Sequence, residues 1–336
     1  MKIVVDDAIP FIHGRLENVA DVIYARGDEI SPSMVADADA LIVRTRTRCD
    51  ASLLRNSRVK MVATATIGTD HIDSEWCGKN GVEVASAPGC NAPGVAQYVL
   101  ASLLKAGFNP QSDYLGIVGY GNVGSTLARW ASVLGIKTLI CDPPRQKAGY
   151  RDVEYLSLDY LLEKSDALTL HVPLTASGEF PTKGMISSAQ IEKMKKGSVL
   201  VNSSRGGVVV EKDLVPFIGS KNIKAVVDVW ENEPYINPRL LDLAFIATPH
   251  IAGYSLEGKR RGTSMALEAL EKKFGFSIDK TGLECIPLMN EVDLTCDIIL
   301  KSYDPSRDSE NLKSHPENFE ILRNNYNYRH EPLFLD

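Results

Sequence analysis

A glycine-rich turn restricts the fold of this 336-residue chain more than any other feature. The run GYGNVG, residues 119–124, directly follows the β-rich segment 115–118 and opens a helix-compatible stretch. In a strand–turn–helix unit, the first glycine permits the tight turn, the second lets the backbone approach a pyrophosphate, and the third lets helix and strand pack closely. Amide groups at the helix start would hold the phosphates. The run therefore predicts a dinucleotide site at Gly119, Gly121, Asn122, Val123 and Gly124.

An acidic residue follows this turn at the distance expected of a ribose ligand. Asp142 comes after the apolar run 137–140 and lies 18 residues beyond Gly124, close to the ~20 that is typical. A carboxylate there repels a 2′-phosphate, which favours NAD over NADP as the cofactor, although the nearby Arg145 favours the opposite choice. In the alternative interpretation, the glycines form an ordinary turn and Asp142 caps a helix.

Short apolar runs alternate with helix-length segments along most of the chain, which is typical of parallel α/β sheets. We expect an α/β fold with two Rossmann-like doubly wound parallel-sheet domains and a short C-terminal extension. The predicted helices are 92–105, 125–134, 187–194 and 262–274. The predicted strands are 2–5, 40–43, 60–64, 82–85, 115–118, 137–140, 167–170, 198–201, 225–227 and 244–247.

One domain is predicted to interrupt the other. Residues 1–92 and about 255–280 form the first domain, and residues 93–254 form the dinucleotide-binding domain. Residues 281–336 are polar and rich in Asn, Asp and Pro, and their few apolar runs give no core by themselves.

Charge and cysteine usage exclude several classes of function. The formal net charge of −6 argues against binding to nucleic acid or to an anionic membrane surface. No stretch approaches the ~20 apolar residues of a membrane span. The six cysteines are scattered without a CxxC pair, so we expect no metal site and free thiols in a reducing cytoplasm.

Candidate catalytic residues follow three predicted strands. Arg205 comes after the strand at 198–201, Glu233 after the strand at 225–227, and His250 after the strand at 244–247. Ligands of doubly wound sheets bind outside the carboxyl ends of the strands, so these side chains can converge. An arginine can bind a carboxylate through two hydrogen bonds, and a carboxylate beside a histidine tunes it as a base. Taken singly, each has an ordinary structural interpretation, and only their order after the glycine turn indicates catalysis.

Four motifs extend this pattern: ATATIGTDHID at 63–73, APGCNA at 87–92, CDPP at 141–144 and PHIAGYSLEGK at 249–259. Together with the glycine turn, Asp142, Arg205, Asp228, Glu233 and His250, they fall in the order of the D-2-hydroxyacid dehydrogenase family, which the chain resembles over about residues 1–275. The stretches PGCN and HIAGYSLEGK are most similar to the branch that acts on 4-phospho-D-erythronate.

The resemblance implies oxidation of 4-phospho-D-erythronate to (R)-3-hydroxy-2-oxo-4-phosphooxybutanoate, with NAD as the cofactor, in pyridoxal phosphate biosynthesis. It implies that Arg205 binds the substrate carboxylate and that His250 is the acid/base, paired with Glu233. It also implies NAD contacts from Asp142, Asp228, Gly253 and Val172, the last standing where a threonine is usual. The implied substrate contacts are Thr45, where a serine is more usual, Thr66 and Tyr254.

Basic residues are available for a substrate phosphate. Arg44, Arg46 and Arg48 alternate after the strand at 40–43, and would share one face if the extended chain continued. A second cluster, residues 259–261, follows His250. Arg44 is the preferred phosphate ligand, although each of these residues can equally be an ordinary surface charge.

The resemblance further implies a cytoplasmic homodimer with a longer C-terminal dimerisation domain than this chain carries. Only residues 322–329 are similar to the end of that domain, so the interface would be reduced. Two other functions remain open. One is a dehydrogenase of another D-2-hydroxy acid, such as phosphoglycerate or glyoxylate. The other is an NADH-sensing binding module, against which the intact set of Arg205, Glu233 and His250 argues.

Overall fold

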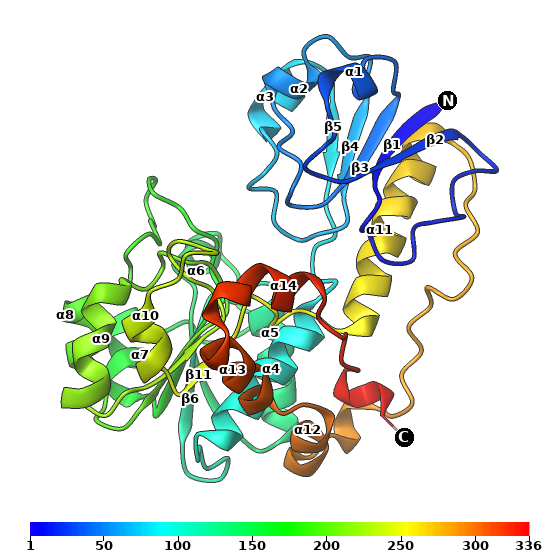
Figure 1. Ribbon diagram of the computed structural model, residues 1–336. Helices are drawn as coiled ribbons and strands as arrows, with labels where there is room; N and C mark the ends of the chain where they lie inside the picture. The colour runs from blue at the N-terminus through cyan, green and yellow to red at the C-terminus, as the bar shows by residue number, and fades with distance from the viewer. Residues whose placement is uncertain (336) are drawn as a thin grey trace. The chain divides into compact units, whose positions relative to one another are not determined.

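The computed structural model describes residues 1–335 and divides into two compact units (Figure 1). Unit 1 comprises Met1–Asn91 and Leu256–Ile286, and unit 2 comprises Ala92–Ser255 and Pro287–Asp336. Each unit is therefore built from two separate segments of the chain. Both contain a parallel sheet covered by helices, so the predicted α/β class is confirmed.

Unit 1 holds a five-stranded parallel sheet in the order β2-β1-β3-β4-β5, which is the flavodoxin-like order. Successive side chains of a strand point to opposite faces, and both faces here are buried. Ile3 and Val5 pack on the face covered by α11, while Val4 packs on the other. The strands are β1 (Lys2–Asp6), β2 (Asp21–Ala25), β3 (Ala40–Val43), β4 (Met61–Thr64) and β5 (Glu83–Ala85), and the helices are α1 (Pro32–Val35), α2 (Ala51–Leu54), α3 (Ser74–Lys79) and α11 (Leu256–Phe274).

Unit 2 holds a six-stranded parallel sheet in the order β11-β10-β9-β8-β6-β7. The chain reverses direction across the sheet between β6 and β8, and dinucleotides bind at the carboxyl ends of strands at such a switch point. The strands are β6 (Tyr114–Val118), β7 (Lys137–Cys141), β8 (Ala167–Leu170), β9 (Val199–Asn202), β10 (Lys224–Val227) and β11 (Ile246–Ala247). The helices up to β11 are α4 (Ala92–Lys105), α5 (Asn122–Val133), α6 (Pro143–Lys147), α7 (Leu158–Lys164), α8 (Ser188–Lys193), α9 (Glu211–Ser220) and α10 (Pro238–Leu243).

The polar C-terminal segment, residues 287–335, completes unit 2. Its helices are α12 (Cys296–Ser302), α13 (Pro305–Ser314) and α14 (Phe319–Asn324). Ile299 is buried on one face of the sheet of unit 2, and Leu312 and Phe319 are buried on the other. Helix α12 contacts α4, and α13 contacts β11, so the segment adds to an existing core and forms none of its own.

Two differences from the sequence prediction concern the packing of unit 1. Strand β2 was not expected, because its residues are only half buried at the sheet edge and form no fully apolar run. Helix α11 begins at Leu256, six residues before the predicted start. Its first turns contain glycines, which lower helix propensity and so concealed the start of the helix. One of them is required by packing, because a Cβ on Gly262 would lie 2.9 Å from the Ala65 carbonyl oxygen. The glycine therefore allows the helix to pack closely on the chain that follows β4.

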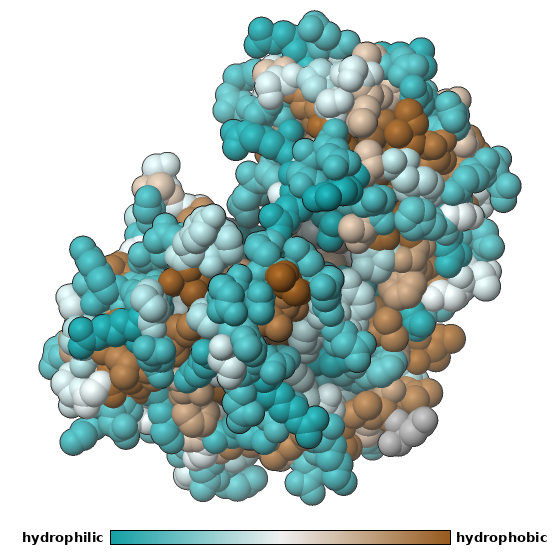
Figure 2. Space-filling model, in the orientation of Figure 1, coloured by the Kyte–Doolittle hydropathy of each residue, from teal (hydrophilic) through white to brown (hydrophobic). Residues whose placement is uncertain are grey.

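The face of the molecule shown in Figure 2 is mostly hydrophilic, with scattered apolar residues, as is usual for folded domains. No helix within residues 1–335 is long and apolar enough to cross a membrane. Across the same residues, no three His, Cys, Asp or Glu side chains are grouped so that they could hold a metal ion.

Candidate active site

The glycine turn of unit 2 has the shape that a dinucleotide requires. Gly119 has a φ of +93°, which is strained for residues with a side chain, and a Cβ there would lie 2.4 Å from the His171 carbonyl oxygen. A Cβ on Gly124 would lie 2.0 Å from the Gly119 carbonyl oxygen. Gly121 has no heavy atom within 4 Å of its Cβ position. Gly119 and Gly124 thus allow the strand and the helix to pack closely. Gly121 leaves open space at the start of α5 for a pyrophosphate.

Asp142 lies beside this turn, at the end of β7. Its carboxylate accepts hydrogen bonds from the backbone N–H of Tyr120 at 2.7 Å and of Arg145 at 3.0 Å. The second bond caps α6, so the capping interpretation describes part of its role, and the first bond fixes the carboxylate against the glycine turn. The Arg145 guanidinium donates to Asp152 and to the Tyr155 hydroxyl. The cation that could favour NADP is therefore already bound by other side chains.

The strand ends of β10 and β11 bring Glu233 and His250 together. The Nδ1 atom of His250 lies 2.8 Å from Oε2 and 3.1 Å from Oε1 of Glu233. The backbone N–H of Trp230 donates to Oε1 of Glu233 at 3.0 Å, which holds the carboxylate in place. Burial pushes the pKa of Glu233 upward, but the hydrogen bonds from His250 and the Trp230 N–H, together with the charges of His250 and Arg323, outweigh it, so the pKa lies below its ordinary value. An ionised carboxylate on Nδ1 leaves Nε2 as the ring nitrogen for proton transfer.

The backbone around His250 is built on a buried carboxylate. Asp228 is 1% exposed and accepts hydrogen bonds from the Thr248 hydroxyl and from the N–H groups of Ile251 and Ala252 at 2.7–3.0 Å. Burial raises the pKa of Asp228 above its ordinary value despite these bonds. His250 itself has a φ of +60°, an unfavourable conformation for a residue with a side chain, and such residues cluster at functional sites.

The turn that carries Arg205 is interlocked with the one that carries Glu233. A Cβ on Gly206 would lie 1.8 Å from the Trp230 carbonyl oxygen, so only glycine fits at this crossing. The indole N–H of Trp230 donates to the Thr248 carbonyl at 3.0 Å, which adds the β11 end. Arg205 donates to the Ser204 carbonyl at 2.8 Å and also has other partners. The ends of β9, β10 and β11 are thus joined through Trp230.

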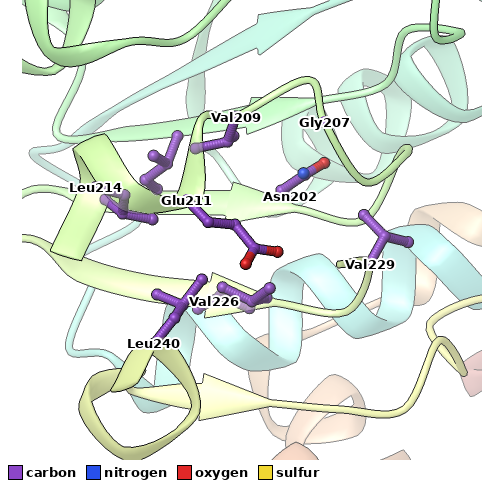
Figure 3. A pocket seen from close by; sticks show the side chains of 10 residues that line it. Asn202, Gly207, Val209, Glu211, Leu214, Val226, Val229 and Leu240 are labelled. Atoms are coloured by element: carbon purple, nitrogen blue, oxygen red, sulfur yellow. The ribbon is translucent and has the colours of Figure 1, made fainter. Parts of the chain in front are cut away.

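Sequence reasoning missed a carboxylate behind this site. Glu211, at the start of α9, accepts from the N–H of Glu231 at 2.7 Å, and Glu231 accepts from the N–H of Glu211 at 3.0 Å. Burial raises the pKa of Glu211, whose side chain points into a cavity of about 10 Å³ (Figure 3), the room that one water needs. The pair fixes the chain just before Glu233. The cavity is lined by Leu200, Asn202, Gly207, Val209, Glu211, Leu214, Val226, Val227, Val229 and Leu240.

The remaining predicted contacts of unit 2 lie at the same end of the sheet. Val172 follows β8, and its side chain lies 3.0 Å from the Cβ position of Gly119, beside the glycine turn. Gly253 and Tyr254 follow His250, and the Tyr254 ring makes edge contacts with Tyr326 and Tyr328. The C-terminal segment therefore reaches the strand ends, which the sequence pattern did not reveal.

Arg44, Thr45 and Thr66 belong to unit 1. Arg44 binds Asp6 through two hydrogen bonds of 3.1 and 3.2 Å, and the Asp6 side chain is fully buried. The chain turns after β3, so the extended conformation that would align Arg44 with Arg46 and Arg48 does not continue. Thr45 is exposed, and the Thr66 hydroxyl lies 2.7 Å from that of Thr64.

Arg44 is thus a cation held rigidly by a buried carboxylate. The second basic cluster, residues 259–261, lies within α11. Arg261 donates to the Cys90 carbonyl at 2.8 Å, and the Arg260 guanidinium lies 5.6 Å from the centre of the Phe11 ring.

Comparisons with known proteins show the family to which the chain belongs. Residues 102–252 match the family described as D-isomer specific 2-hydroxyacid dehydrogenase, NAD binding domain. Erythronate-4-phosphate dehydrogenase of Bacteroides fragilis (strain YCH46) is 44% identical over 98% of this chain and 97% of its own length. The chain belongs to the erythronate-4-phosphate dehydrogenase family. As a member of this family of D-2-hydroxyacid dehydrogenases, it is an NAD-dependent enzyme.

Other members of this family are matched over a smaller part of their own length. Erythronate-4-phosphate dehydrogenase of Escherichia coli O157:H7 (strain EC4115 / EHEC) is 43% identical over 82% of this chain but only 74% of its own length. The Bacteroides fragilis relative, in contrast, is matched over nearly its whole length. Among solved structures, D-lactate dehydrogenase from Aquifex aeolicus, complexed with NAD and lactic acid, aligns with a TM-score of 0.68 at 26% identity, over 82% of this chain and 96% of that one.

Proposed function

We propose that the protein oxidises 4-phospho-D-erythronate to (R)-3-hydroxy-2-oxo-4-phosphooxybutanoate with NAD, in pyridoxal phosphate biosynthesis. The observation that carries this proposal is the Glu233–His250 pair at the same end of the sheet as the glycine turn, in a chain whose relatives bear the name of that reaction. A half-buried carboxylate, a histidine whose second ring nitrogen can transfer a proton, and a dinucleotide turn are the parts that oxidation of a hydroxy acid needs.

His250 and Arg205 have distinct roles in this mechanism. Arg205 binds the substrate carboxylate and so orients C2 of the substrate. Nε2 of His250 takes the proton of the C2 hydroxyl, while Glu233 on Nδ1 stabilises the charged ring that results. NAD, when bound, accepts the hydride from C2. Asp228 holds the backbone on which His250 is presented, through the N–H groups of Ile251 and Ala252.

Cofactor and substrate contacts are assigned on the same basis. Residues 119–124 cradle the pyrophosphate, with Val172 beside them and Gly253 as a further NAD contact, and Asp142 binds the ribose hydroxyls and repels a 2′-phosphate. Arg44, oriented by Asp6, binds the substrate phosphate. Thr45, Thr66 and Tyr254 complete the substrate contacts.

The test is spectroscopic measurement of NADH formation with 4-phospho-D-erythronate and, for comparison, with 3-phosphoglycerate. Glyoxylate is assayed in the reductive direction, by the consumption of NADH. We expect turnover of the four-carbon phosphate, and a fall of about 10²- to 10⁴-fold in kcat/KM for His250→Gln and for Arg205→Ala. Turnover of another hydroxy acid but not of 4-phospho-D-erythronate would show that the substrate assignment is wrong. NADH binding without turnover of any of the three would indicate a sensing module instead.

Quaternary state and location are part of the same proposal. We propose a homodimer in the cytoplasm, on the basis of the family to which the chain belongs. Sedimentation equilibrium should give twice the 36.8 kDa chain mass. A monomer with full turnover would show that the shorter C-terminal segment supports the active site without a partner.

A further inference from the structure

An arginine of the C-terminal segment lies beside the Glu233–His250 pair. Arg323, in α14, has Nη1 at 3.6 Å from Oε2 of Glu233 and Nε at 3.4 Å from the Tyr254 hydroxyl. The Arg323 and Glu233 side chains are only 17% and 19% exposed. Oε2 is also the atom closest to the His250 ring. One carboxylate oxygen is therefore shared between the histidine and the arginine.

The chain that follows Arg323 is fixed to the backbone that carries His250. Arg329 donates to the carbonyls of Ile251 at 3.1 Å and of Tyr254 at 3.3 Å, and also to that of Ala252. Its Nε donates to Oε1 of the fully buried Gln97 at 2.9 Å. Just beyond it, the buried Glu331 accepts from the Ser255 hydroxyl at 2.6 Å. These bonds hold α14 beside the strand ends on a frame of buried groups.

The charges around the pair come from several elements. Asp228 is a nearby buried acid that interacts with both His250 and Arg323. Glu211 and Glu231 lie behind Glu233, and Arg205 is on the neighbouring turn. Beyond Arg323 lie Tyr254, Tyr326, Arg329 and Asp308. Within this set, the Arg323 guanidinium lies 3.6 Å from Glu233, which is within the range of an ion pair.

We propose that Arg323 is a positioning residue that holds the Glu233 carboxylate and limits how strongly His250 retains a proton. The proposal rests on the proposed function in one respect, the assignment of His250 as the acid/base.

The physical reason is the sharing of Oε2. A carboxylate facing only a histidine stabilises the protonated ring, whereas a neighbouring guanidinium offsets part of that negative charge and disfavours the protonated form. Oxidation of a hydroxy acid needs the neutral ring, because the ring must accept the hydroxyl proton. Removal of Arg323 takes away this offset.

The first experiment compares the pH profiles of kcat/KM for the wild-type enzyme, Arg323→Gln and Arg323→Lys. We expect the acidic limb of the Arg323→Gln profile to move to higher pH by about 0.5 to 1 unit, with activity largely restored near pH 9. Arg323→Lys keeps the charge and should stay near the wild-type profile. Arg307→Gln, which removes an exposed arginine of α13, controls for loss of one positive charge in the same segment.

The second experiment needs no turnover. NMR titration of [¹³Cε1]histidine-labelled protein, with His250 assigned by His250→Gln, should show the His250 signal titrating at higher pH in Arg323→Gln than in the wild type and in Arg307→Gln. Thermal melting monitors folding of each variant. A lower activity at every pH with an unmoved His250 titration would assign Arg323 a purely structural role and overturn the proposal. Absence of 4-phospho-D-erythronate turnover together with a moved titration would instead refute only the substrate assignment.

Discussion

Gly206 is the position at which the structure makes the sharpest mutational prediction. A Cβ there would lie 1.8 Å from the Trp230 carbonyl oxygen and 2.4 Å from its carbonyl carbon. Real Cβ atoms do not approach heavy atoms closer than 3.0 Å, so Gly206→Ala must separate the two turns by more than 1 Å. The atoms it meets belong to the backbone and cannot rotate away.

The displacement falls on two proposed catalytic groups. Arg205 precedes the substituted residue, and the N–H of Trp230 holds the Glu233 carboxylate at 3.0 Å. A misplacement of about 1 Å at a reacting group can lower the rate by about 100-fold. We therefore expect kcat/KM for the hydroxy acid to fall by about 100-fold or more, with overpacking lowering the free energy of unfolding by about 1 to 3 kcal/mol.

Steady-state kinetics and urea unfolding measure the two effects, and Gly219→Ala is the matched control. Gly219 lies in α9, and no heavy atom lies within 4 Å of its Cβ position. Its replacement should leave kcat/KM unchanged and raise stability by up to about 1 kcal/mol, because alanine favours the helix. Wild-type kinetics and stability in Gly206→Ala would refute the argument that this crossing positions the site.

Three further predictions concern other parts of unit 2 and the cysteines. Arg329→Met should lower the free energy of unfolding by about 3 to 5 kcal/mol in urea titrations, since several buried carbonyls and Gln97 lose their donor; a change below about 1 kcal/mol would contradict this. Asp142→Asn should weaken NAD binding about 10-fold or more in a fluorescence titration without creating tight NADP binding, because Arg145 is bound to Asp152 and Tyr155; tight NADP binding would show that Arg145 is available. Burial raises the pKa of Cys141 to about 11 and that of Cys49 to about 12, so thiolates are scarce at pH 8. Mass spectrometry should therefore find both cysteines alkylated by iodoacetamide only after denaturation. Rapid labelling of the folded protein would show that the thiols are accessible.

The sequence predicted correctly those elements that show a recognisable pattern of residues within one short segment. Helix α4 occupies the predicted residues 92–105, because apolar side chains recur there at helical spacing. The strands of both sheets that are buried on two faces were recognised from short apolar runs, whereas the half-exposed β2 was missed. The glycine turn could be interpreted residue by residue, since the reason for each glycine lies within the same strand–turn–helix unit: a tight turn, close packing or open space for a phosphate.

Contacts between distant parts of the chain could not be predicted in this way. The convergence of Glu233 and His250 follows from the rule that ligands bind at the carboxyl ends of parallel strands. No such rule placed Arg323 beside Glu233, because 90 residues separate them and α14 is a short polar helix. The pairing of Arg44 with Asp6 likewise depends on β1 and β3 being neighbours in the sheet.

The division of each unit between two chain segments has a consequence for synthesis on the ribosome. Unit 1 lacks α11, which covers one face of its sheet, until residue 274 has left the exit tunnel. Unit 2 lacks Ile299, Leu312, Phe319 and Leu333 until residue 333 has been made. Neither unit can therefore complete its core until a second, much later segment has been made, and the nascent chain exposes apolar surface until then. Chaperone binding during synthesis should consequently be stronger than for a tandem arrangement of the same two sheets.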